Sequence, residues 1–112
     1  MEEETQDMVD STVIDAFHMM WGSFPEPVRL IHKNRTVLAV NGIAASRGME
    51  VGVFCYSLGN PELHKVCSAN AALVSKAGQR IDADDGRIRF WSPVGNCPDV
   101  FVHFVIFRDA QQ

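Results

Sequence analysis

Residues 100–107, with the sequence VFVHFVIF, form the stretch that decides the fold. Seven of these eight residues are apolar, and they stand at both phases of the two-residue strand period. Both sides of such a strand must be covered by other parts of the chain, which places it centrally in a sheet. We therefore expect a sheet centred on residues 100–107, with helices on one face and another element on the other.

Four shorter segments supply partners for this strand. The β-branched runs 28–31 and 36–40 predict one β-hairpin, joined by residues 32–35, in which Asn34 is expected to adopt the left-handed conformation. A second hairpin is expected from residues 79–82 and 87–91, turning at 84–86, and residues 93–99 are expected to form a loop. Because the hairpins flank a helical block, the pattern predicts an α+β domain with an antiparallel sheet.

Three helices are expected around this sheet. Residues 11–21 begin at a capping-box pattern of Thr12 and Asp15, and Val13, Phe17 and Trp21 form one apolar stripe. Asn41 is placed to cap a short helix over 42–47, after which residues 49–61 are irregular. The third helix is expected over 63–77, with Asn70 on its apolar stripe and Gly78 as its C′ residue.

Length and charge limit the class of protein. A chain of 112 residues suits one domain, and its net charge of −4 argues against nucleic-acid binding. Five of its fourteen acids fall within residues 1–10, which we expect to be a disordered acidic leader to a single domain at 11–108, with a polar tail at 109–112. No apolar stretch is long enough to span a membrane, and three cysteines fit a reducing, cytoplasmic location.

The order of segments resembles the PAS domain, a small sensor module. The resemblance is carried by residues 24–32 (FPEPVRLIH), residues 36–41 (TVLAVN), Gly48 and residues 50–52 (EVG). It implies a five-stranded antiparallel sheet in the order 2-1-5-4-3, with the last strand at its centre. It also implies helices on one face around a ligand cavity, and an N-terminal helix that packs on the other face or in a dimer.

Two interpretations of the interior remain open, a ligand pocket and a filled core. The pocket interpretation uses mostly apolar walls with a few polar groups, as small-molecule sites do. Its expected lining is Tyr56, Asn70, Phe90, Ser92 and His103. His103 is also a possible haem ligand or a hydrogen-bonded sheet residue. Lys33 and the arginines at 29, 35, 87 and 89 could form a basic patch, but they are interpreted as a solvated face, because charges at alternate strand positions usually are.

A metal site is the second candidate. Cys55, His64 and Cys67 have the spacing C-x8-H-x2-C, and His64 and Cys67 would share one helical face, which suits Zn²⁺. The competing interpretation treats both cysteines as small buried apolar residues and His64 as a solvated residue at a helix start. The sequence does not decide between them.

The predicted function is that of a cytoplasmic sensory or regulatory domain, not an enzyme. It would bind a small effector or a partner signalling protein and act through a homodimer interface formed by Val13, Phe17 and Trp21. The alternative is a metal or redox sensor built on the Cys/His spacing. The nature of any cofactor stays open between a small molecule, haem and a metal, and neither nucleic acid nor a membrane is an expected partner.

Overall fold

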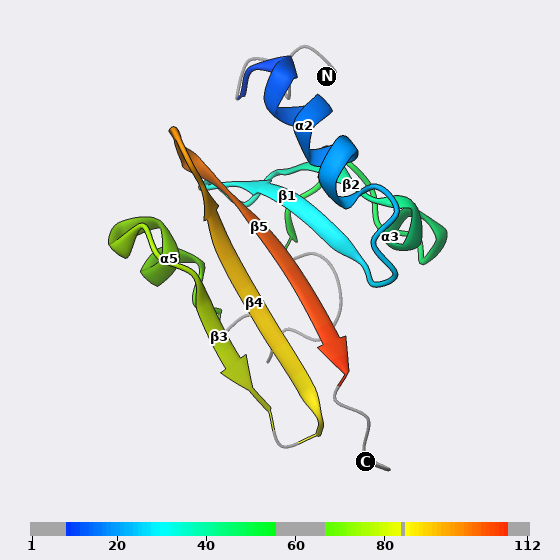
Figure 1. Cartoon of the computed structure of the whole chain (residues 1–112), viewed down its shortest axis with the longest axis vertical. Helices are drawn as coiled ribbons and strands as arrows, with labels where there is room; N and C mark the ends of the chain where they lie inside the picture. The colour runs from blue at the N-terminus through cyan, green and yellow to red at the C-terminus, as the bar shows by residue number, and fades with distance from the viewer. Residues whose placement is uncertain (1–8, 56–66, 84, 108–112) are drawn as a thin grey trace.

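The sheet has the expected strand order. The computed structural model describes residues 9–55, 67–83 and 85–107. Within these residues it has one antiparallel sheet of five strands in the order β2-β1-β5-β4-β3 (Figure 1). The strands are β1 (Val28–His32), β2 (Val37–Val40), β3 (Gln79–Asp82), β4 (Arg87–Val94) and β5 (Cys97–Phe107). The expectation that the last strand lies between the two hairpins is confirmed.

Three helices are described. They are α2 (Ser11–Trp21), α3 (Gly42–Ser46) and α5 (Ala69–Ser75). The N-cap of α2 is Asp10 and not Thr12, because the Asp10 carboxylate accepts a hydrogen bond from the Thr12 backbone N–H at 3.0 Å. Asp10 was assigned to the acidic leader, yet it begins the first helix. No helix in the described residues combines the length and the apolar character that a membrane crossing requires.

The strand registers divide the side chains between two faces of the sheet. Directly paired residues of antiparallel strands point to the same side. We call the side covered by α2 the α2 face; it includes Leu30, Phe90, Val102 and Phe104. The opposite side, here the α5 face, includes Ile31, Trp91, Phe101 and His103. Both sides of β5 are thus covered, as its sequence requires.

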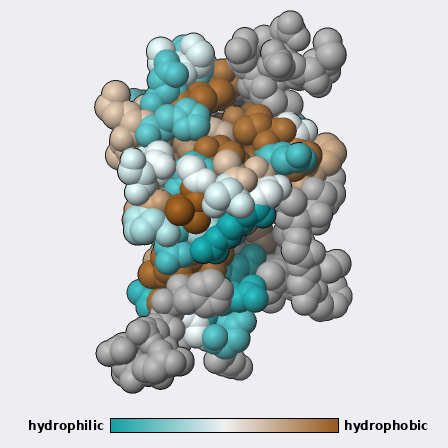
Figure 2. Space-filling view, turned by 90° about the vertical axis from the view of Figure 1, so that its right-hand side faces the viewer, coloured by the Kyte–Doolittle hydropathy of each residue, from teal (hydrophilic) through white to brown (hydrophobic). Residues whose placement is uncertain are grey.

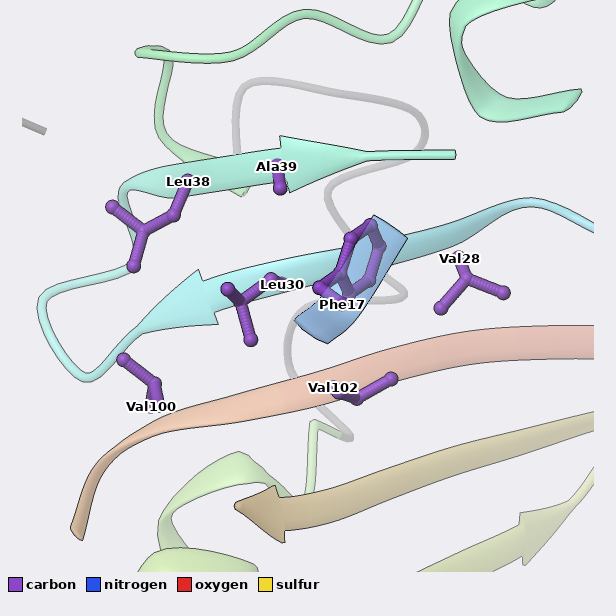
Figure 3. Packing of buried hydrophobic residues seen from close by; sticks show 7 residues of the cluster. All are labelled: Phe17, Val28, Leu30, Leu38, Ala39, Val100 and Val102. Carbon is purple, nitrogen blue, oxygen red and sulfur yellow. The ribbon is translucent and has the colours of Figure 1, made fainter. Parts of the chain in front are cut away.

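Helix α2 packs on its own sheet through the predicted stripe. Phe17 is 4% exposed, and its ring lies over β1 beside Val28 and Leu30 (Figure 3). Trp21 extends this contact, with ring centroids 5.2 Å from Phe24 and 5.3 Å from Phe104. The opposite side of the helix is solvated, and Met19 and Met20 are exposed there. The α2 face is therefore apolar, and a cavity of about 390 Å³ lies between α2 and the sheet, with Val13, Phe17 and Leu30 among its lining residues.

Two turns differ from their predictions. In the β1–β2 turn it is Arg35 that adopts a positive φ of 78°, while the side chain of Asn34 accepts from the Thr36 backbone N–H at 2.9 Å. Residues 93–99 are not a loop, since β4 continues to Val94 and β5 starts at Cys97. The intervening turn is tight, with Asn96 at φ 65°. A bulge between Pro93 and Val94 lets a proline, normally a strand breaker, remain in the sheet.

Helix α5 is shorter than the helix predicted over residues 63–77. Cys67 and Ser68 precede it without helical structure, and it ends before Lys76, which takes the left-handed φ of 57° assigned to Gly78. Its buried residues are Ala69 and Ala72, whereas Val74 is 84% exposed. Small alanines let the helix approach the sheet closely, so the larger apolar side chains were misleading guides to its buried side.

Candidate functional site

Four positively charged or titratable side chains meet on the α5 face. Arg29 of β1 is paired in register with His103 of β5, which is paired in turn with Trp91 of β4. Arg89 and Arg87 occupy the next positions of the same phase on β4. Strand register alone therefore brings three arginines and a histidine from three strands to one side of the sheet.

A cavity of about 250 Å³ lies beside these residues. Strands β1, β4 and β5 supply one part of its lining, and the segment that follows α3 supplies another. The described residues that line it are Pro27, Arg29, Arg47, Met49, Arg87, His103, Phe104 and Val105. Three of these described residues are arginines and none is acidic. Figure 2 shows the side of the molecule that carries α3, where hydrophilic residues lie between separate hydrophobic groups.

Burial makes the arginines of this site unusual. Arg89 is only 5% exposed, and its guanidinium lies 4.8 Å from the centroid of the Trp91 ring. Desolvation by burial lowers the pKa of both Arg29 and Arg89, and their mutual repulsion lowers the pKa of Arg29 further. Both remain charged at neutral pH, because an arginine pKa starts far above that range. The site thus holds positive charge in a poorly solvated place.

The buried arginine side chains are incompletely hydrogen-bonded within the described residues. The Nη1 atoms of Arg29 and Arg89 are both buried and have no hydrogen-bond partner in the part of the chain that the structure describes. Buried polar groups nearly always have partners, and leaving a charged donor without one costs about 1–3 kcal/mol or more. Arg87 differs, because its Nε lies 3.1 Å from an Asp85 carboxylate oxygen.

His103 is held in a defined orientation. Its ring stacks on Trp91 with a centroid separation of 5.0 Å and an angle of 11°. Its Nδ1 lies 2.8 Å from the Phe90 carbonyl oxygen. A carbonyl only accepts, so Nδ1 carries the hydrogen of this bond. The cavity is below the usual size range of drug-sized ligand sites and is too small to hold a haem at His103.

The predicted pocket residues do not share one site. Phe90 and Ser92 point to the α2 face, and the Phe90 ring stacks on Phe104 at 4.8 Å. Asn70 was expected to face the core, but it is exposed on α5 and accepts a hydrogen bond of 2.8 Å from Arg35 Nη2. Tyr56 lies outside the described residues. Of the five, His103 alone is placed by the structure at the cavity.

The arginines were found in the sequence but misinterpreted as a solvated face. Two features of the sequence indicate that these arginines are buried. Trp91 is in phase with Arg87 and Arg89, and tryptophan is among the more buried side chains. The doubly apolar central strand also implies cover on both faces of its neighbours. Sequence reasoning had no means to decide which of these two signals outweighed the usual exposure of arginine.

The Cys/His spacing gives no metal cluster in the described residues. Cys55 is buried and Cys67 is half-buried, but His64 lies outside the described part of the chain. The argument that His64 and Cys67 share a helical face fails, because Cys67 precedes the first residue of α5. A metal or redox sensor on these residues is therefore not favoured.

The predicted dimer stripe is occupied within the chain. Phe17 is buried against β1, and Val13 and Trp21 pack against the same cluster. Phe17 is therefore not exposed to a partner chain, whereas Val13 and Trp21 are half-buried. A dimer through Val13, Phe17 and Trp21 stays a prediction. On the solvated side of the same helix, Met19 is 84% and Met20 is 73% exposed.

Solved structures provide the comparison that decides the fold. No family model and no curated protein matches the sequence. A sensory box sensor histidine kinase from Vibrio cholerae is similar, with a TM-score of 0.62 and 11% identity over 89% of this chain and 96% of that chain. The PAS domain of an HTR-like protein from Haloarcula marismortui gives a TM-score of 0.51 and 11% identity, over 87% and 98% of the two chains.

The chain has the PAS fold. The sequence resemblance and the strand order are thereby confirmed together. In this PAS-fold chain the cavity lies on the α5 face, and α2 covers the other face. At this level of identity the likeness extends to the fold, and the chemistry of the cavity is this chain's own.

One prediction concerns the Cys55 thiol, which adjoins the arginines. Burial raises its pKa, with a smaller opposite effect of Arg29. Above the pKa of an unfolded cysteine, about 8.5, the unfolded chain loses this proton before the folded chain does. Stability therefore falls as pH rises from about 8.5 towards the folded pKa, by up to about 1.4 kcal/mol per pH unit for one proton.

Urea unfolding of the wild type and of Cys55→Ser from pH 7 to pH 10 measures this effect. Serine does not ionise in this range, so the wild type should lose stability relative to the variant only above about pH 8.5. Parallel stability curves across the whole range would show that burial does not govern this thiol.

Proposed function

We propose that this chain is a sensory signalling domain that binds a small effector in the cavity on the α5 face. The PAS fold supports the class of function, since the similar solved structures include a sensory box histidine kinase. The observation that carries the proposal is the cavity itself, bounded by Arg29 and His103 and adjoined by buried donors that lack partners. A filled core would satisfy its own polar groups.

Strand β5 offers a route from the cavity to the opposite face. His103 lines the cavity, and its neighbour Phe104 lies in the aromatic cluster of the α2 face. The Phe104 ring is 5.3 Å from the ring of Trp21, the last residue of α2. A ligand that shifts β5 at His103 therefore also moves Phe104, against which Trp21 of α2 packs. We propose that the output is read at α2, by a second copy of the chain or by a partner signalling protein in the cytoplasm.

NMR titration tests this proposal. Isotope-labelled protein is titrated with a panel of carboxylates, phosphates, amines and uncharged amides. At least one compound should shift the amide signals of Arg29 and His103 in a saturable way, together with the Trp21 indole signal. The matched variant Val105→Trp fills the cavity with a larger side chain and should lose the response while keeping its circular dichroism spectrum.

The outcomes are separable. If no compound of the panel shifts the cavity residues, the chain is not an effector-binding domain of the proposed kind. If the cavity residues shift and Trp21 does not, binding stands but the route through Phe104 is wrong. Where Val105→Trp does not fold, Val105→Phe provides the smaller filling change, and an undiminished response in a folded filled variant would move the site elsewhere.

A further inference from the structure

The charged side chains among the described lining of the cavity are all positive. Its described lining includes Arg29, Arg47 and Arg87 and no carboxylate, and Arg89 stands next along β4 on the same face. Of the described carboxylates in the five strands, Asp82 lies on the opposite face, and Asp99, near the start of β5, pairs with Lys33 at 3.3 Å. Four guanidinium groups in one region repel one another, and low local polarity makes the repulsion stronger than it is in water.

The exposed arginines of this chain behave differently. Arg80 lies on the other face of the sheet and donates to both carboxylate oxygens of Asp82, at 2.6 and 3.0 Å. The half-buried Arg87 reaches Asp85 in the turn of its hairpin, at 3.1 Å. Among the described residues, Arg29 and Arg89 keep a buried Nη1 without a hydrogen-bond partner. In this part of the chain, carboxylates pair with the more exposed arginines, where pairing contributes least, and none pairs with the buried Nη1 atoms.

Two guanidinium groups with buried, incompletely hydrogen-bonded atoms lower the stability of the fold. Replacing buried charges by apolar residues of similar size is often neutral or stabilising. Their presence is explained if an anion from solution completes them, since a guanidinium binds a carboxylate or phosphate through two parallel hydrogen bonds. Arg47 is exposed and lines the same cavity, so it is placed where a ligand would enter or leave.

Resting on the proposed function, we propose that the effector is a compact anion, a small carboxylate or phosphate compound, and that Arg29 and Arg89 bind its charged group. The cavity of about 250 Å³ limits the ligand to a few heavy atoms beyond the charged groups. Trp91 and His103 form the stacked platform beneath Arg89 and set its position. The Nδ1–H of His103 donates its hydrogen bond to the Phe90 carbonyl and therefore does not bind the anion.

Matched probes test the charge requirement. Succinate, inorganic phosphate and the uncharged succinamide are titrated by calorimetry and by NMR at constant ionic strength set with sodium chloride. Succinate or phosphate should bind the wild type and succinamide should not. Arg89→Met and Arg29→Met should each weaken binding about tenfold or more, the effect of losing a charge-assisted hydrogen bond. Without anion, the urea midpoint of Arg89→Met should exceed that of the wild type.

The control is Arg80→Met, which removes an arginine from a neighbouring strand on the opposite, solvated side. It should leave anion binding unchanged. Binding of succinate and succinamide with equal affinity would overturn the anion assignment and leave the proposed effector cavity in place. No binding of succinate or phosphate, or binding that survives both Arg29→Met and Arg89→Met, would overturn the assignment as well. If one variant fails to fold, the other provides the same comparison.

Discussion

Replacing Asn41 by alanine is expected to destabilise the fold by about 3 to 5 kcal/mol. This side chain is 1% exposed and joins four segments. Its Oδ1 accepts from the backbone N–H groups of Val28 and Ala44, both at 3.0 Å. Its Nδ2 donates to the carbonyls of Trp21, Phe24 and Glu26 at 3.2, 3.2 and 2.9 Å. Alanine leaves buried donors at Val28 and Ala44 without acceptors, and each costs about 1–3 kcal/mol.

The expected loss of stability is large because of where Asn41 lies as well as how many hydrogen bonds it makes. Asn41 caps α3, but it also fixes the end of α2 and the start of β1. Chemical unfolding monitored by circular dichroism measures the loss. Asn70→Ala is the matched control, because Asn70 is exposed and accepts a hydrogen bond from Arg35; its cost should be within about 0.5 kcal/mol. A loss below about 1 kcal/mol for Asn41→Ala would show that water replaces these bonds.

Asn41→Asp separates the two halves of the network. It keeps the acceptor for Val28 and Ala44 but places a second oxygen against three carbonyl oxygens. A protonated carboxyl restores one donor, so the folded state raises the pKa of the introduced group above its unfolded value of about 3.9. The stability of this variant relative to the wild type is therefore greatest below about pH 4 and falls as pH rises. An equal deficit at pH 3.5 and pH 7 would argue against the donor role.

Trp91→Ala is the second change with a large expected effect, about 3 to 5 kcal/mol. Trp91 is 1% exposed and lies at the centre of the cluster that joins β4, β5 and α5. Its ring stacks on His103 and carries the Arg89 guanidinium at 4.8 Å. Alanine leaves a cavity under α5 and removes the contact that shields a buried charge. Unfolding is followed by circular dichroism, because the substitution removes a fluorophore.

Two comparisons test the physical reason. Trp21→Ala makes the same chemical change on the α2 face, where the ring is half-buried, and should cost clearly less. Trp91→Phe keeps an aromatic platform and should recover most of the stability. Similar losses for both tryptophan-to-alanine variants would mean that Trp91 contributes only its apolar area. A Trp91→Phe variant as unstable as Trp91→Ala would assign the effect to the indole and its contact with Arg89.

Local patterns predicted much of the fold because they act over few residues. The apolar run 100–107 required cover on both sides, and the β-branched runs required hairpins; both features are present as β5 and its neighbours. Asn41 was correctly expected to cap a helix. Errors occurred where neighbours in space outweigh neighbours in sequence. Helix α5 is defined by Ala69 and Ala72 against the sheet, and its more apolar Val74 faces solvent.

The candidate site shows the same division. Residue types and phases along each strand are readable from the sequence, and the structure places His103, one of the predicted pocket residues, at the cavity. The sequence alone does not show the register between strands. This register places Arg29 beside His103 and His103 beside Trp91. The sequence also does not say which face receives α2 and which receives α5. These depend on pairings between residues far apart in the chain, whose energies no local window includes.

By itself, the sequence determined that the chain builds an antiparallel sheet with a buried central strand, because alternation and periodicity fix which positions must avoid water. The tertiary structure alone decided that Arg89 is buried and Arg29 half-buried, each with a buried Nη1 atom, and that neither lies on the solvated face where its charge suggested it belongs. A side chain's exposure depends on what the rest of the chain places over it. For Arg29 and Arg89 that cover creates a charged interior, and with it the site proposed for an anion.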